Sequence, residues 1–216
     1  MRVLVVTAVA AEADSVAAAV AGAGNGAGNG IDVIAGGVGP AAAAAATATA
    51  LATSPYDLVI SAGIGGGFPS HAPVGSLVVA DAIVAADLGA ETPDGYLPVD
   101  ELGFGRTTHL PPAQLATRAA LATGALCAPI LTVSTVTGSA ARAAELSGRH
   151  PRAAAEAMEG FGVAEAAAVH GVPVLEIRAI SNAVGPRDRA AWRIGPALAA
   201  LGSAFPPLIP LFEEPS

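Results

Sequence analysis

Residues 2–21, RVLVVTAVAAEADSVAAAVA, show the pattern that organises the whole chain. The run of Val and Leu at positions 3–6 has apolar residues on both faces, as a strand covered by helices on both sides requires. The alanine-rich run that follows predicts a helix, because alanine has the highest helix propensity. A strand followed directly by a helix favours a layered α/β fold.

The same alternation continues to the end of the chain and predicts one α/β domain over residues 1–216. The connection 22–30 (GAGNGAGNG) is of low complexity and predicts a surface linker. Residues 86–111 show little periodicity and predict a long loop that serves as a binding element or lid. The proline-rich tail after Phe205 is expected on the surface. Strands are predicted at 2–6, 31–35, 58–61, 75–85, 130–135 and 174–181, and helices at 11–21, 40–52, 112–124, 140–150, 158–170 and 189–204.

Charge and composition exclude several classes of protein. Ten basic and 18 acidic residues give a formal net charge of −8 without a basic cluster, which argues against nucleic acid as a partner. The single cysteine, Cys127, and four scattered histidines show no metal-ligand spacing, so neither a metal nor an organic cofactor is expected. The apolar N-terminal run is short, and no stretch reaches the roughly 18 clean apolar residues of a membrane span, so the cytoplasm is expected.

Two glycine-rich segments follow predicted strands. Gly37, Gly39 and Ala42 satisfy the G-x-G-x-x-A dinucleotide pattern, but the acid expected at the end of the next strand is missing, so tight packing of strand on helix explains them better. The segment Gly63-Ile64-Gly65-Gly66-Gly67 predicts a turn whose backbone N–H groups face a ligand.

Three polar residues stand where apolar residues are expected. Glu12 follows the first strand, Glu159 begins an apolar helix, and Asn182 ends the apolar strand 174–181. Each has an ordinary explanation, either as an acid in the first turn of a helix or as a helix cap. All three nevertheless fall on the side of an α/β sheet where ligands bind.

At these positions the chain resembles the purine nucleoside phosphorylase/nucleosidase superfamily, and within it the methylthioadenosine/S-adenosylhomocysteine nucleosidases. The resemblance covers residues 1–186. It implies a mixed, partly closed sheet surrounded by helices, and a homodimer or higher homo-oligomer whose partner chain helps to close the 5′ side of the sugar. The residues that carry it are Glu12, the segment Gly63–Gly67, the motif Ala157-Met158-Glu159, and the motif Arg178-Ala179-Ile180-Ser181-Asn182-Ala183.

The resemblance also implies roles for single residues. Glu12 is the general base that activates water, and Glu159 binds the ribose hydroxyls and favours the positive charge that develops on the sugar. Met158 packs under the sugar. Val136 and Thr137 face the base, partly through backbone groups, and Asn182 contacts N7 and position 6 of the base.

Two departures from the nucleosidase pattern refine this interpretation. Adenine-specific nucleosidases have Asp where this chain has Asn182. The Asn carbonyl oxygen accepts from a protonated N7–H while its NH₂ donates to a 6-oxo oxygen, which predicts hypoxanthine or guanine as the base. Residues 7–15 contain no arginine and offer Glu12 instead, a carboxylate that repels phosphate and suits water activation.

A hydrolase for a 6-oxopurine nucleoside in this branch is similar to the futalosine hydrolases, which release hypoxanthine from futalosine in a pathway of menaquinone biosynthesis. Futalosine carries a carboxyphenyl ketone on its 5′ side. Within the loop 86–111, Phe104 is expected to stack on that ring, and Arg106 or His109 to pair with the carboxylate. The alternatives are a purine nucleoside phosphorylase, a methylthioadenosine/S-adenosylhomocysteine nucleosidase, or a non-catalytic nucleoside or dinucleotide-binding module.

Overall fold

The computed structural model describes residues 1–23 and 30–213. Most of the linker predicted at 22–30 therefore lies outside the described residues. Each predicted strand and helix has a counterpart in the structure, and the strand predicted at 31–35 has those bounds.

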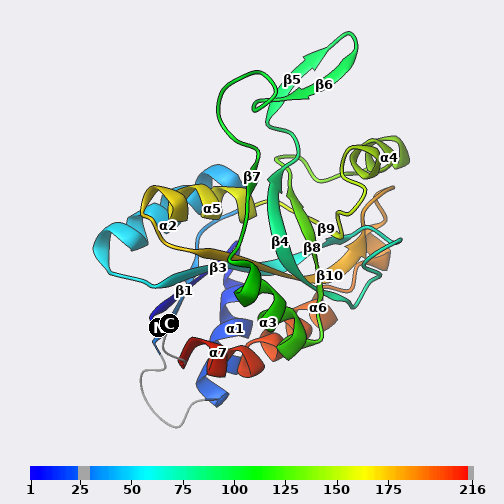
Figure 1. The fold of residues 1–216 in the computed structure, drawn as a ribbon. Helices are drawn as coiled ribbons and strands as arrows, with labels where there is room; N and C mark the ends of the chain where they lie inside the picture. Colours follow the sequence, from blue (N-terminus) through cyan, green and yellow to red (C-terminus); the bar gives the residue numbers. More distant parts are fainter. Residues whose placement is uncertain (24–29, 214–216) are drawn as a thin grey trace.

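A mixed sheet of eight strands forms the centre of the molecule (Figure 1). The strand order is β10-β4-β8-β9-β3-β1-β2, and β10 also pairs with β3, so the strands from β10 to β3 close into a ring that β1 and β2 extend. This confirms the partly closed mixed sheet. The strands are β1 (Val3–Thr7), β2 (Ile31–Ala35), β3 (Leu58–Gly67), β4 (Leu77–Ala85), β7 (Thr108–His109), β8 (Leu126–Thr132), β9 (Ala155–Ala157) and β10 (Val174–Ala183).

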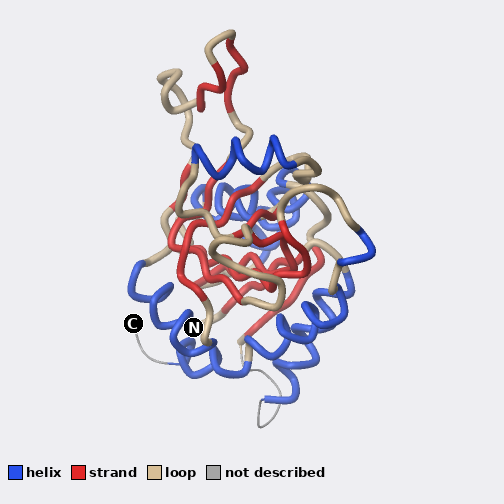
Figure 2. The backbone as a smooth tube through the Cα atoms, turned by 90° about the vertical axis from the view of Figure 1, so that its right-hand side faces the viewer, coloured by secondary structure: helices blue, strands red, loops and turns tan. Residues whose placement is uncertain are grey.

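Helices cover both faces of the sheet (Figures 1 and 2). On one side, α2 packs on α5, and their alanines allow close approach to the sheet. On the other side, α1, α6 and α7 bury Val, Leu and Phe side chains against β1, β3 and β10, and α3 packs its alanines on β4 and β8. The helices are α1 (Ala10–Ala23), α2 (Pro40–Thr53), α3 (Ala113–Thr123), α4 (Ala140–Arg149), α5 (Gly160–Val169), α6 (Ile194–Ala204) and α7 (Ile209–Glu213).

The C-terminal segment differs from the prediction of a surface tail. Residues 206–213 form a 3₁₀ turn and α7, and Leu208, Ile209 and Phe212 are buried. By length and composition, Ile194–Glu213 is the one helical stretch among the described residues that could cross a membrane, a stretch that the sequence analysis did not identify. Its buried side chains pack against the same core cluster as α1 and α3.

The segment 86–111 also has more structure than the predicted loop. It contains a hairpin of β5 (Gly89–Thr92) and β6 (Gly95–Pro98), which projects from the body of the molecule, and β7, which pairs with β4 (Figures 1 and 2). The hairpin packs on α4 through Tyr96, whose ring centroid lies 4.1 Å from the guanidinium carbon of Arg149.

Candidate active site

A cavity of about 320 Å³ opens where the carboxyl ends of the parallel strands β1, β3 and β10 meet. Ligands of open α/β sheets bind at this position. The cavity collects most of the predicted site residues, and its described lining contains no Lys or Arg. The lining residues are Ala8, Val9, Glu12, Val38, Ile64, Gly65, Gly66, Val136, Glu156, Ala157, Met158, Glu159, Ser181, Asn182 and Trp192.

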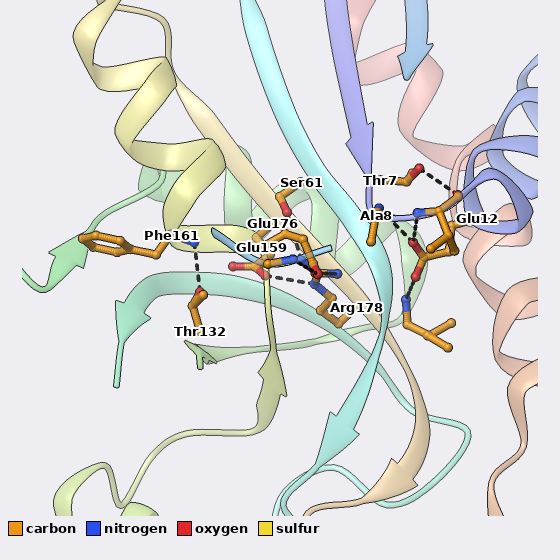
Figure 3. A network of polar contacts seen from close by, with 12 residues as sticks. Thr7, Ala8, Glu12, Ser61, Thr132, Glu159, Phe161, Glu176 and Arg178 are labelled. Carbon is orange, nitrogen blue, oxygen red and sulfur yellow. Dashed lines mark hydrogen bonds and ion pairs between the residues drawn. The ribbon is translucent and has the colours of Figure 1, made fainter. Parts of the chain in front are cut away.

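The carboxylate of Glu12 is held by three backbone N–H groups (Figure 3). Its Oε2 accepts from Ala8 at 2.9 Å and Val9 at 3.2 Å, and its Oε1 accepts from Ile64 at 2.9 Å. Glu12 therefore does cap the start of α1, as its ordinary explanation predicted, but it also crosses to β3. A carboxylate has about four lone-pair positions, so one remains for a water molecule in the cavity.

Glu159 lies in a buried charge cluster with Arg178 and Glu176 (Figure 3). The guanidinium of Arg178 lies 3.3 Å from Oε2 of Glu159 and 2.9 Å from Oε1 of Glu176, and it donates to Oγ of Ser61 at 3.0 Å. The other oxygen of Glu159 accepts from the N–H of Gly39 at 3.2 Å. Glu159 is the N-cap residue of α5, where an acid is favourable with the helix dipole, but its side chain makes no capping hydrogen bond.

The amide of Asn182 reaches the cavity because β10 has an irregularity at Ser181. Ile180 pairs with Gly65 and Asn182 with Gly66, which leaves Ser181 as the extra residue of a bulge. A bulge of this kind redirects the side chains that follow it. Since Asn182 lies within β10, it is not a helix cap.

The glycine-rich segment is a strand and not the predicted turn. Gly63 to Gly67 belong to β3 and pair with β10, and the N–H of Ile64 is bound by Glu12. The glycines serve close packing instead: a Cβ on Gly63 would lie 2.5 Å from a guanidinium nitrogen of Arg178 and 2.8 Å from Oε1 of Glu12. Gly63 thus leaves room for the side chains of Arg178 and Glu12, while Ile64 and Gly65 line the cavity.

Packing also explains the first glycine motif. A Cβ on Gly37 would lie 2.9 Å from Cβ of Ala42, and a Cβ on Gly36 would lie 2.9 Å from Val6. These contacts support the packing explanation over a dinucleotide site.

Val136 and Thr137 follow β8 as expected, but their surroundings differ. Val136 lines the cavity, whereas Thr137 is buried behind it. The N–H of Thr137 donates to Oε1 of Glu156 at 2.8 Å, and its hydroxyl donates to Oε2 of the same carboxylate. Of the backbone groups that were expected to face the base, the N–H of Thr137 is therefore occupied.

Phe104 and Arg106 lie outside the cavity of their own chain. Phe104 is 64% exposed, and Arg106 lies 3.8 Å from Glu165 on the surface of α5. His109 is buried against Phe161, and its Nε2 lies 2.8 Å from Oε1 of Glu165. All three belong to the projecting segment 86–111 and its base.

Four residues of the site were given no role by sequence reasoning. Arg178 and Glu176 are fully buried charges, and both interrupt the apolar strand VLEIRAIS, a signal that could have revealed them. Burial raises the pKa of Glu176 to about 7, although Arg178 opposes the shift. Glu156 interrupts an alanine run in the same way, and Trp192 lines the cavity from the connection before α6.

Comparison with known proteins identifies the family. Residues 23–195 match the family model of the phosphorylase superfamily. A futalosine hydrolase of Streptomyces coelicolor is 74% identical over 160 residues, which cover 74% of this chain and 68% of that protein. The chain belongs to the futalosine hydrolases of the phosphorylase superfamily.

Other futalosine hydrolases extend this relation. The protein of Acidothermus cellulolyticus is 49% identical over 161 residues, which cover 72% of this chain and 65% of that protein. The solved futalosine hydrolase of Helicobacter pylori superposes with a TM-score of 0.80 over 97% of each chain at 16% identity, which shows the shared fold. In the part of this chain that the structure describes, no group of three or more His, Cys, Asp or Glu side chains could hold a metal ion.

Proposed function

We propose that this chain hydrolyses the N-glycosidic bond of futalosine and releases hypoxanthine and dehypoxanthinyl futalosine, a step of menaquinone biosynthesis. The observation that carries the proposal is the placement of Asn182, whose amide lies on the cavity wall and can bind a 6-oxopurine. The futalosine hydrolase of Streptomyces coelicolor, at 74% identity, supports the substrate.

In the proposed reaction, Glu12 accepts a proton from water through its remaining lone-pair position while the water oxygen bonds to C1′ of the sugar. The C1′–N9 bond breaks, the base leaves with the bonding electrons, and it takes a proton from solvent water at N7. Glu12 then returns the proton it accepted to solvent, so the sum is the addition of one water molecule across the bond. Glu159 binds the ribose hydroxyls and, with its negative charge, stabilises the cation-like sugar. Met158 packs beneath the ring.

The electrostatics of the cavity support water over phosphate as the nucleophile. Glu12 and Glu159 line it, and its described lining offers no Lys or Arg to hold an anion. Arg178, the basic side chain closest behind it, is engaged by Glu159, Glu176 and Ser61. Phosphate beside Glu12 and Glu159 would therefore meet like charge, with no basic side chain of the same chain in the described cavity lining to compensate.

The test is release of the base from futalosine, inosine and methylthioadenosine, each with and without phosphate, followed by chromatography. We expect hypoxanthine from futalosine at a rate that phosphate does not change. Strict dependence on phosphate would indicate a phosphorylase, adenine from methylthioadenosine alone would indicate the nucleosidase alternative, and binding without turnover would indicate a non-catalytic module.

Asn182→Asp tests how the base is selected. A carboxylate has no hydrogen to donate to the 6-oxo oxygen, and one lost hydrogen bond in a buried site costs about 1–3 kcal/mol. We expect kcat/KM for futalosine to fall about 10- to 100-fold relative to the unsubstituted chain, with a smaller loss, or a gain, for methylthioadenosine. An unchanged ratio between the two substrates would show that Asn182 does not select the base.

We also propose that the chain acts in the cytoplasm as a homodimer or higher homo-oligomer in which the segment 86–111 reaches the cavity of a partner. This arrangement gives Phe104 and Arg106 access to the 5′ substituent, which they lack in their own chain. The exposed Leu88, Phe104 and Leu110 supply an apolar surface for such a contact. Light scattering should give at least twice the chain mass of 20.8 kDa, and a single-chain mass would contradict the proposal.

A further inference from the structure

Glu156 and Asn182 lie in one row across three neighbouring strands. In the register of the sheet, Glu156 of β9 pairs with Gly66 of β3, and Gly66 pairs with Asn182 of β10. Directly paired residues project to the same face of a sheet, so both side chains flank Gly66 on one face. Two strand spacings separate them by about 10 Å at Cα, and all three residues line the cavity.

Gly66, which has no side chain, leaves the space between Glu156 and Asn182 unfilled. A Cβ at this position would lie 3.2 Å from the amide nitrogen of Asn182 and 3.0 Å from a methyl group of Val184. A side chain there would fill the space between Glu156 and Asn182. Without one, a planar ring can lie between a carboxylate on one side and an amide on the other.

The contacts of Glu156 determine what its side of the cavity offers. The N–H and the hydroxyl of Thr137 both donate to this carboxylate, which occupies two of its roughly four lone-pair positions. The loop after β8 therefore presents no free N–H at Thr137. Glu156 lines the cavity and keeps about two lone-pair positions on its buried carboxylate, so this edge of the cavity can accept hydrogen bonds.

We infer that Glu156 accepts the N1–H of the 6-oxopurine ring, opposite Asn182, and is a specificity-determining residue of the site. A 6-oxopurine carries a hydrogen on N1, whereas adenine presents a lone pair there, which a carboxylate repels. Asn182 and Glu156 then bind two different edges of one base, and only a ring with a 6-oxo oxygen and an N1–H satisfies both. This inference rests on the proposed function, since it names the residue that selects the same base.

Glu156→Gln tests the inference because it is nearly isosteric and can keep both contacts to Thr137. The Gln carbonyl oxygen accepts from the N–H of Thr137, and its NH₂ donates to the Thr137 hydroxyl, so a donor now faces the cavity. The measurement is calorimetric titration of the full chain with free hypoxanthine and free adenine, which needs no turnover. We expect the hypoxanthine-to-adenine affinity ratio to fall at least about 10-fold, the effect of exchanging one matched hydrogen bond.

Two controls separate base recognition from a purely structural role. Glu101→Gln changes an equivalent acid on the exposed surface and should leave the ratio unchanged. The unsubstituted chain should bind 1-methylhypoxanthine, which lacks the N1 hydrogen, at least about 10-fold more weakly than hypoxanthine. If Glu156 only anchors Thr137, Glu156→Gln lowers both affinities equally, and the unchanged ratio overturns the inference.

The proposed function is judged separately, by release of hypoxanthine from futalosine by the unsubstituted chain. Release together with an unchanged ratio in Glu156→Gln would overturn the role of Glu156 alone. Absence of release would overturn the proposed function, whatever the titrations give.

Discussion

Glu12→Gln is expected to lower kcat for futalosine about 10³-fold, within the range that a positioned general base contributes. The lone pair that faces the cavity belongs to a carboxylate whose other positions are taken by the N–H groups of Ala8, Val9 and Ile64. A Gln side chain places its carbonyl oxygen toward Ala8 and Val9, where two donors converge, and turns its NH₂ toward Ile64. It then has no basic group for the water.

The same geometry predicts a loss of stability for this variant. The NH₂ of the substituted side chain would face the N–H of Ile64, and two donors without an acceptor cost about 1–3 kcal/mol when buried. The measurement is therefore single-turnover hydrolysis at a temperature where circular dichroism shows the variant to be folded, with hypoxanthine affinity as the test of an intact site.

Asp14→Asn is the matched control, because Asp14 lies on the same helix and is exposed. We expect its kcat to equal that of the unsubstituted chain. Turnover retained by Glu12→Gln, with hypoxanthine affinity unchanged, would remove Glu12 as the base and leave the water to another group.

Much of the fold follows from the sequence because strands and helices are marked by different compositions. The apolar β-branched runs and the alanine runs identified β1, β2, α1 and α2 nearly to their bounds. The segment Gly63–Gly67 misled the prediction because glycine is common both in turns and where strands must leave room for buried side chains. Here the glycine at position 63 leaves room for the side chains of Arg178 and Glu12. These two residues are far apart in sequence, so only the structure shows this.

The site was predicted in part for a similar reason. Glu12, Glu159 and Asn182 could be identified because each departs from its local pattern, and Met158 was added because the set together resembles a family. The hydrogen bond between Glu156 and Thr137 could not be predicted from the sequence, because it depends on β9 lying beside and parallel to β8. The predicted contact of Phe104 with a ligand is not made within its own chain, where this side chain is exposed and lies outside the cavity.

Substitution of Glu176 is the second change with a large expected effect, in this case on the free energy of unfolding. Its carboxyl is fully buried, its Oε1 accepts from Arg178 at 2.9 Å, and its Oε2 has no partner among the described residues. A Cβ on Gly160 would lie 2.1 Å from Oε2, so the start of α5 closes over this oxygen. Burial accordingly raises the pKa of Glu176 to about 7 from an ordinary value of 4.5.

The raised pKa of Glu176 determines how the free energy of unfolding changes with pH. Below about pH 4.5, Glu176 is protonated in both the folded and the unfolded chain and the raised pKa has no consequence. As pH rises towards 7, the unfolded chain loses this proton first, so the free energy of unfolding falls, by about 3 kcal/mol in total. Glu176→Gln resembles the protonated acid at every pH and escapes this loss.

We therefore expect Glu176→Gln to gain about 3 kcal/mol in stability relative to the unsubstituted chain between pH 4.5 and pH 7.5, measured by urea unfolding. Groups that titrate in both proteins cancel when the free energies of unfolding of the variant and the unsubstituted chain are subtracted. For Glu101→Gln, a substitution at an exposed site, this difference should not change with pH. A flat difference for Glu176→Gln as well would mean that Arg178 keeps this carboxylate ionised throughout. In the expected case Glu176 is largely neutral below about pH 7, and the charge of Arg178 then pairs mainly with Glu159.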